Sequence, residues 1–149
     1  MIKVSPMTWA SVPLVAELEN SIFTLPWSED TLYDELDNPT ARFLVASDDG
    51  NVLGYIGANN ICGEWYIDNI AVREDARRRG VGSMLMSSLI EKARNENALF
   101  LTLEVRPSNT PAIRLYEKFG FTVRGERKGF YSEPKEDAFI MTVDLQDEE

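Results

Sequence analysis

The sequence contains no histidine and only one cysteine, Cys62, among its 149 residues. Without histidine, imidazole-based catalytic triads and the commonest metal ligand are excluded, so we expect no metal. Acid–base chemistry is left to carboxylates, tyrosines or the thiol. A single cysteine cannot form an intrachain disulfide, which favours a cytoplasmic location. With no histidine to activate it, Cys62 is interpreted as a buried or idle thiol, so direct transfer is expected of any acyl-transfer chemistry.

Long apolar segments are also missing. No stretch approaches the ~20 apolar residues that span a bilayer, and the first ten residues lack the apolar core of a signal peptide. We therefore expect no membrane association. No internal repeat or Gly/Ser-rich linker divides the chain, and its length suits one hydrophobic core. A single domain over residues 1–149 is expected.

Positive charge is scarce and unevenly placed. The formal net charge is −10, and residues 4–41 contain no lysine or arginine but seven acidic residues, Glu17, Glu19, Glu29, Asp30, Asp34, Glu35 and Asp37. This segment is compatible with solvated helix faces and also with a surface that attracts a basic partner. Nucleic acid is disfavoured as the main ligand, because phosphate binding usually needs a broad basic surface.

Hydrophobic periodicity predicts seven strands and four helices. Strands are expected at residues 2–4, 42–47, 52–60, 64–72, 99–105, 121–127 and 138–145. Helices are expected at residues 12–23, 29–36, 80–97 and 109–119. Because hairpins alternate with strand–helix–strand crossovers, the predicted fold class is α/β or α+β, with a mixed central sheet flanked by helices. Residues 147–149 are expected to fray.

Turn and cap residues refine these boundaries. Ser11 and Ser28 are predicted to cap the first two helices. The sequence "DDGN" at residues 48–51 predicts a tight hairpin turn, and Gly120 is placed to end the last helix. Residues 128–137, which are rich in charge and turn formers, are predicted to form a loop.

The densest positive charge is Arg77-Arg78-Arg79, which directly precedes Gly80 and Gly82 at the start of a predicted helix. The first N–H groups of a helix lack internal partners and carry partial positive charge, so they bind anions. Glycines allow a phosphate to approach the backbone, and arginines add charge and bidentate donors. The turn is thus interpreted as a pyrophosphate site or as a solvated basic turn. The Walker and dinucleotide-binding motifs are absent.

This R-x-x-G-x-G turn resembles the acetyl-CoA pyrophosphate loop of the GCN5-related N-acetyltransferase (GNAT) superfamily. The similarity covers nearly the whole chain. Five further segments together are similar to the bacterial ribosomal-protein-alanine N-acetyltransferases: "NIAV", "LTLEVRPSN", "AIRLYEKFGF", "RKGFY" and "EDAFIM". The resemblance implies a GNAT fold of about seven strands and about four helices, with acetyl-CoA as co-substrate.

The same resemblance implies which residues contact acetyl-CoA. The strand before the loop is implied to pair its backbone with the pantetheine arm at Ile70, Ala71 and Val72. The loop is implied to bind the pyrophosphate through Arg77, Arg78, Arg79, Gly80, Val81, Gly82 and Ser83.

Acetyl transfer from a thioester to an amine needs a base for the amine and an acid for the departing thiolate. Glu104 ends a predicted strand, and on sequence alone it is either a base or an exposed acid. Tyr116 lies two helical turns after Asn109, and it is either an acid or part of the core. The resemblance implies Glu104 as base, Tyr116 as acid and Asn109 as a cofactor contact. Because an ordinary glutamate is a weak base, partial burial or a relaying water is expected.

The acceptor is predicted to be a protein N terminus. An α-amino group has a pKa of about 7.7–8.0, against about 10.4 for lysine, so a weak base deprotonates it more easily. The resemblance also implies this acceptor, with the alanine of a basic small-subunit ribosomal protein as substrate. Candidate substrate contacts are Leu25, Pro26 and Trp27, between the first two helices, and Phe130 and Tyr131, in the predicted late loop. Such aromatic residues are equally compatible with a role in covering the core.

Three other functions fit parts of the sequence. A GNAT enzyme that acetylates lysine or small amines would share the same core. A non-catalytic acyl-CoA-binding module would retain the loop but would not need Glu104 and Tyr116. Nucleic-acid binding through the arginines conflicts with the net charge. A monomer or weak dimer is expected.

Overall fold

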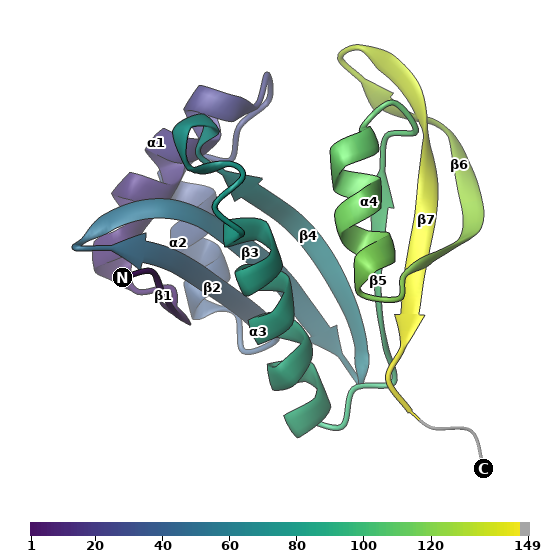
Figure 1. The fold of residues 1–149 in the computed structure, drawn as a ribbon, viewed down its shortest axis with the longest axis horizontal. Helices are drawn as coiled ribbons and strands as arrows, with labels where there is room; N and C mark the ends of the chain where they lie inside the picture. Colours follow the sequence, from purple (N-terminus) through teal and green to yellow (C-terminus); the bar gives the residue numbers. More distant parts are fainter. Residues whose placement is uncertain (147–149) are drawn as a thin grey trace.

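The computed structural model describes residues 1–146 and shows a seven-stranded sheet with helices on both faces (Figure 1). The strands are β1 (Lys3–Pro6), β2 (Ala41–Asp48), β3 (Asn51–Ile61), β4 (Glu64–Val72), β5 (Phe100–Val105), β6 (Thr122–Ser132) and β7 (Lys135–Asp144). The helices are α1 (Val12–Ile22), α2 (Glu29–Asp37), α3 (Val81–Asn95) and α4 (Thr110–Lys118). This order confirms the predicted mixed sheet flanked by helices. The predicted fraying of residues 147–149 lies outside the described residues.

The sheet separates two hydrophobic cores. Its strand order is β1-β2-β3-β4-β5-β7-β6, and all neighbours are antiparallel except β4 and β5. Helices α3 and α4 pack on one face through a core that includes Leu85 and Tyr116. Helices α1 and α2 cover β2 to β4 on the other face, through Val15 and Leu32. Within residues 1–146, every helix falls short of the length and apolarity that crossing a bilayer requires.

Local sequence signals set several boundaries as predicted. Asp49 and Gly50 adopt positive φ angles of 49° and 81° in the tight turn between β2 and β3. The Ser28 hydroxyl accepts a hydrogen bond from the N–H of Thr31 over 3.2 Å and so caps α2. Gly120, with φ of 91°, follows the end of α4.

The prediction that Ser11 caps the first helix is wrong. A short 3₁₀ turn, Trp9–Ser11, precedes α1, and Ser11 lies in right-handed helical conformation at its end. Its hydroxyl instead donates to the carbonyl of Thr8 and accepts from the Thr8 N–H. The serine therefore caps the 3₁₀ turn and not α1.

The late hairpin also differs from the prediction. A loop was predicted over residues 128–137, but β6 continues to Ser132 and β7 begins at Lys135. The pairing is irregular around Gly129, whose N–H donates to the Asp137 carboxylate over 2.7 Å. Because this carboxylate supplies the acceptor for the Gly129 N–H, a segment rich in glycine and charge stays in an extended hairpin.

A single methyl group at Gly54 tests the packing of α3 on the sheet. A Cβ there would lie 2.7 Å from the carbonyl oxygen of Ala71 and 3.2 Å from Val81. Since a backbone oxygen cannot move aside easily, Gly54→Ala is expected to lower the free energy of unfolding by about 1–3 kcal/mol, measured by urea denaturation. Gly125→Ala is the matched control, because its Cβ would make an ordinary 3.5 Å contact with Ile140. Equal unfolding midpoints for the two variants would contradict this packing argument.

Candidate active site

The site is located where β4 and β5 separate. These parallel strands pair only from Glu64–Tyr66 to Phe100–Thr102, and beyond that point they diverge (Figure 1). On its other edge β4 pairs with β3, but Asp68 is left without a partner between Ile67 and Asn69. This β-bulge lies where the strands part. A cleft of about 600 Å³ opens there.

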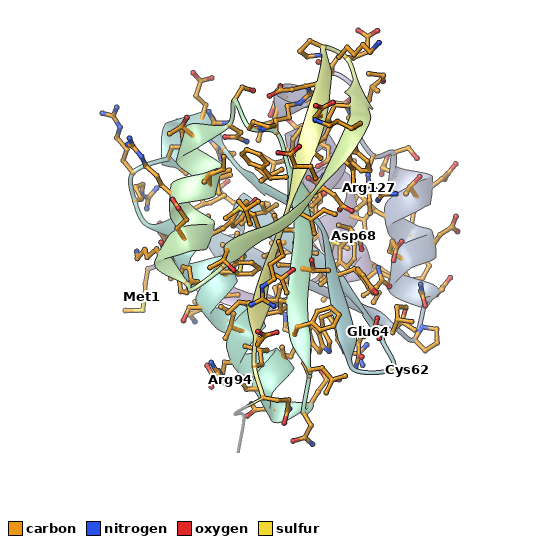
Figure 2. All side chains as sticks on the ribbon, turned by 90° about the vertical axis from the view of Figure 1, so that its right-hand side faces the viewer. Met1, Cys62, Glu64, Asp68, Arg94 and Arg127 are labelled. Atoms are coloured by element: carbon orange, nitrogen blue, oxygen red, sulfur yellow. The ribbon has the colours of Figure 1, made fainter. Side chains whose placement is uncertain are left out.

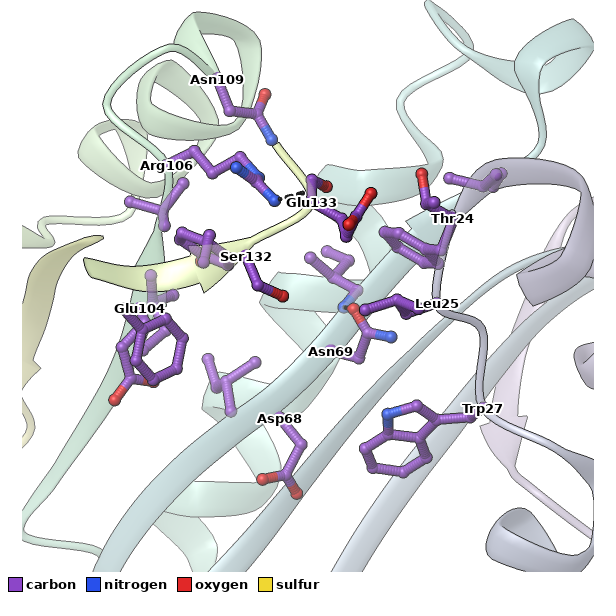
Figure 3. A pocket seen from close by; sticks show the side chains of 18 of the residues that line it. Thr24, Leu25, Trp27, Asp68, Asn69, Glu104, Arg106, Asn109, Ser132 and Glu133 are labelled. Atoms are coloured by element: carbon purple, nitrogen blue, oxygen red, sulfur yellow. Dashed lines mark hydrogen bonds between the residues drawn. The ribbon is translucent and has the colours of Figure 1, made fainter. Parts of the chain in front are cut away.

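The cleft has two facing walls (Figure 3). The connection between α1 and α2 forms one wall, and the end of β6 with its turn forms the other. Eight of the predicted site residues line the cleft: Leu25, Trp27, Ile70, Glu104, Asn109, Tyr116, Phe130 and Tyr131. Ala71, Val72 and residues 77–83 are not part of this lining, because they continue from β4 into the turn that leads to α3. Tyr131 lies in β6 and not in a loop.

Glu104 and the core residues of β5 point to opposite faces of the sheet. Leu103 and Val105 are buried, whereas the Glu104 side chain is 33% exposed, in line with the expected partial burial. One carboxylate oxygen of Glu104 accepts a hydrogen bond from Arg127 on β6 over 3.0 Å. The sequence did not predict this ion pair.

Tyr116 approaches the cleft from α4. Only 5% of the residue is exposed, and its ring packs against Phe121 with centroids 5.8 Å apart. Burial, reinforced by Tyr131, raises the pKa of Tyr116 far above its ordinary value, so the phenol is protonated at neutral pH. Tyr116 is therefore a core residue, as one of the two sequence interpretations had it, and it also lines the cleft. Asn109 caps α4 by accepting from the N–H of Ala112 over 3.3 Å.

The arginine–glycine turn leaves the start of α3 open. Gly80 precedes α3 in a left-handed conformation with φ of 76°, and no side chain caps the helix. A Cβ built at Gly80 would meet nothing within 4 Å. Lys118 donates to the Ser83 hydroxyl over 3.0 Å, which adds a positive charge that the sequence analysis missed. This open, positively charged helix start fits a phosphate group.

The three arginines of the turn differ in their surroundings. Arg79 pairs with Asp48 over 3.4 Å. Arg77 donates to the carbonyl oxygen of Val72 over 3.4 Å. Arg78 is exposed and adopts a positive φ of 73°. The Asp48 pair shares the charge of Arg79, so Arg77 and Arg78 are the better placed for an anion.

Asp68 is a cleft residue that the sequence analysis missed. It lies on the bulge, opens to the same cleft as Glu104, and accepts a hydrogen bond from Asn59 (Figure 3). Surrounding protein removes part of its hydration, and this, with the charges of Glu35 and Glu104, raises the pKa of Asp68 to about 6. A charged residue within the strand pattern "YIDNIAV" was the available signal.

Arg106 fixes the wall formed by β6. Its guanidinium donates to the carbonyl oxygens of Pro134 (2.6 Å) and Glu133 (3.0 Å). It also lies 4.1 Å from the ring centroid of Tyr131. One side chain at the end of β5 thus holds both the turn and the aromatic ring that face the cleft. No local sequence pattern indicated this long-range role.

Cys62 lies away from the cleft. It is exposed in the turn between β3 and β4, at the opposite end of β4 from the arginine turn (Figure 2). It is absent from the lining of the cleft. Cys62 is therefore not the buried thiol that was one of the two expectations; it is an exposed thiol outside the cleft.

Known proteins with similar sequences and folds are acetyltransferases. The sequence model of the acetyltransferase (GNAT) family matches residues 12–121. A Bacillus subtilis protein, named provisionally as a ribosomal protein bS18-alanine N-acetyltransferase, is 42% identical over 134 residues, covering 89% of each chain. The ribosomal protein bS18-alanine N-acetyltransferase of Salmonella typhimurium is 31% identical, covering 97% of this chain and 99% of its own.

Comparison of the fold with solved structures also finds acetyltransferases. The crystal structure of the ribosomal-protein-S18-alanine N-acetyltransferase from Escherichia coli superposes with a TM-score of 0.92 at 28% identity, covering 100% of this chain and 97% of the other. The family match spans most of the chain, and the aligned relatives span nearly all of their own length. The chain therefore belongs to the GNAT family of acetyltransferases.

Proposed function

We propose that residues 1–149 form a single N-acetyltransferase domain that transfers the acetyl group of acetyl-CoA to the N-terminal α-amino group of a protein. The proposed acceptor is the N-terminal alanine of a basic ribosomal protein of the small subunit, and the relatives' names, which specify an alanine of ribosomal protein bS18, support it. The proposed location is the cytoplasm. One observation carries the chemical part of the proposal. A single cleft, opened by the separation of β4 and β5, contains both a carboxylate, Glu104, and a protonated phenol, Tyr116.

The arginine turn and β4 are proposed to bind acetyl-CoA. The uncapped start of α3, the open space at Gly80 and the charges of Arg77, Arg78 and Lys118 suit its pyrophosphate. The second half of β4 has no pairing with β5, and on that edge its backbone meets only side chains, at Ile70 and Val72, so a pantetheine arm could bond residues 70–72 by replacing them. No metal enters this scheme.

Glu104 and Tyr116 are proposed to act from opposite faces of the sheet. Glu104 faces the side of α1 and α2, and Tyr116 belongs to the core beneath α4. On the Glu104 side, the carboxylate accepts a proton from the amine, directly or through one water. The amine nitrogen then bonds to the acetyl carbon, the carbon–sulfur bond breaks, and the sulfur takes the phenol proton of Tyr116. Burial keeps the phenol protonated, so its proton is available to the sulfur. Because the same burial disfavours a phenolate, a proton from solvent must then restore Tyr116, while Glu104 releases the proton that it took from the amine.

The acceptor peptide is proposed to lie between the two walls of the cleft. Leu25 and Trp27 contribute apolar surface on one side, and Tyr131 contributes it on the other. Asp68 lies within the same cleft, and Glu35 on α2 is close enough for its charge to act on Asp68. A basic residue close to the acceptor N terminus would thus approach negative charge, which agrees with a basic protein substrate.

A peptide panel tests the acceptor assignment. Peptides that share one internal lysine but differ in the first residue are incubated with acetyl-CoA and the enzyme, and the modified position is read by tandem mass spectrometry. The peptide that begins with alanine is expected to gain one acetyl group at its α-amine, because the more acidic α-ammonium suits a carboxylate base. The control is the same peptide with a blocked N terminus. Acetylation confined to the lysine side chain would overturn the assignment.

Substitutions at the two proposed catalytic groups test their roles. Glu104→Gln removes the base and Tyr116→Phe removes the acid, so each is expected to lower kcat by about 10²–10⁴-fold. Acetyl-CoA affinity, measured by calorimetry, is expected to stay nearly unchanged in both. Glu126→Gln and Tyr66→Phe are matched controls, because both side chains are exposed outside the cleft. Turnover equal to the wild type in either catalytic variant would remove that residue from the mechanism.

Asp68 is expected to favour acceptors with an early positive charge. Wild-type enzyme is compared with Asp68→Asn, using Ala-Arg and Ala-Gln peptides of otherwise equal sequence. The kcat/KM preference for the Ala-Arg peptide should decrease in the variant, because a charged carboxylate becomes a neutral amide. In the wild type the preference should also fall as the pH drops through about 6, where Asp68 takes up a proton. A preference independent of both changes would contradict the role.

A further inference from the structure

A buried carboxylate lies behind the acceptor wall and takes no part in the chemistry above. Glu19, on α1, is 0% exposed. No lysine or arginine forms an ion pair with it in residues 1–146. An uncompensated buried carboxylate is costly for a fold, so its hydrogen-bond partners identify what it does.

Three donors from three parts of the chain converge on Glu19. One carboxylate oxygen accepts from the backbone N–H of Trp27 over 2.8 Å. The other accepts from the Tyr55 hydroxyl on β3 and from the Asn69 amide on β4, both over 2.8 Å. Asn69 in turn accepts, through its side-chain oxygen, from the N–H of Ile70 over 3.1 Å. The carboxylate therefore joins the α1–α2 connection to the bulged part of β4.

The ionised form of Glu19 can accept a hydrogen bond from each of these three donors. An ionised carboxylate only accepts hydrogen bonds, and all three neighbouring groups donate to it. Burial raises the pKa of Glu19, but the bonds from Trp27 and Tyr55 oppose that effect. A glutamine side chain has one acceptor oxygen and one donor amide, so it cannot satisfy both sides of this cluster at once.

The α1–α2 connection depends on this contact. In the described structure, Trp27 is the only residue from 24 to 27 whose backbone N–H donates to another protein group. The same segment supplies Thr24, Leu25 and Trp27 to the wall of the cleft. Without Glu19, that wall would keep its aromatic packing on Phe43 but lose the bond that sets its backbone.

We propose that Glu19 is a positioning residue for the acceptor substrate, fixing the Thr24–Trp27 wall against Asn69 before the peptide binds. The proposal rests on the proposed function, because it assigns this wall to the acceptor and not to acetyl-CoA. Glu19 makes no hydrogen bond to the arginine turn, and it reaches the proposed acetyl-CoA side only indirectly, through Asn69 and the Ile70 N–H. Loss of Glu19 should therefore weaken binding of the acceptor peptide more than binding of acetyl-CoA.

Steady-state kinetics with both substrates test the proposal. Glu19→Gln is expected to raise KM for the acceptor peptide about tenfold or more, since a buried donor loses its acceptor, while KM for acetyl-CoA changes far less. Glu91→Gln, which removes the same charge from the exposed surface of α3, is the matched control and should behave like the wild type. An unchanged peptide KM, or an equal rise in both KM values, would overturn the proposal.

Hydrogen exchange gives a readout that does not require turnover. The amide of Trp27 is expected to be protected in the wild-type enzyme and in Glu91→Gln, and to exchange much faster in Glu19→Leu, which leaves this N–H without an acceptor. Tyr55→Phe removes one donor to Glu19 but keeps the Trp27 bond, so it should preserve the protection of the Trp27 amide. This variant is the fallback where the Glu19 variant fails to fold. Rapid exchange of Trp27 in the wild type would refute the positioning role. Failure of the wild type to acetylate the peptide would instead count against the proposed function alone.

Discussion

The early end of the pairing between β4 and β5 is the constraint on which the site depends. Hydrogen bonding between these two parallel strands stops after three residue pairs, and the β-bulge at Asp68 follows directly. Backbone groups that lose a neighbouring strand need other partners. Side chains supply two of them: Asn69 accepts from the N–H of Ile70, and Arg77 donates to the carbonyl of Val72. An extended ligand along β4, as proposed for the pantetheine arm, would have to replace these two bonds with its own.

The separation of the strands also explains how one site can use both faces of a sheet. In a closed sheet, Glu104 and Tyr116 would be isolated from one another by the β5 backbone and its neighbours. Here the cleft reaches both residues. Positive charge gathers at the turn before α3, where Arg77, Arg78 and Arg79 precede the helix and Lys118 bonds to Ser83. A chain with a net charge of −10 thus concentrates positive charge where a diphosphate is proposed to bind.

Local signals in the sequence were sufficient for most of the fold and for part of the site. The turn at Asp49 and Gly50, the cap at Ser28 and the helix end at Gly120 depend on neighbouring residues only, and all three were predicted. Ser11 was assigned to the wrong turn because its partner, Thr8, begins a 3₁₀ turn that has no clear periodicity. Residues 128–137 were taken for a loop because the acceptor for Gly129 comes from Asp137, across the hairpin.

The same distinction applies to the site. Glu104, Tyr116 and the arginine turn lie in short motifs, so they could be proposed from the sequence through the family resemblance, and the structure places Glu104 and Tyr116 in one cleft. Contacts that depend on the folded chain could not be found in this way. Arg127 meets Glu104 across 23 positions of sequence, and Arg106 reaches the β6–β7 turn across 27 and 28. The bulge that exposes Asp68 follows from strand register, which no local pattern specified.

Glu19 shows why stability alone does not account for this arrangement. Its neighbours in the core under α1 are apolar, among them Val15 and Leu32. A well-packed apolar side chain often replaces a buried charged group at little cost, or with a gain in stability. That substitution would leave the Trp27 N–H and the Asn69 amide without their acceptor, which is costly wherever these donors stay buried. The carboxylate is therefore best understood through the geometry it imposes on the two sides of the cleft, because the hydrophobic core would form without it.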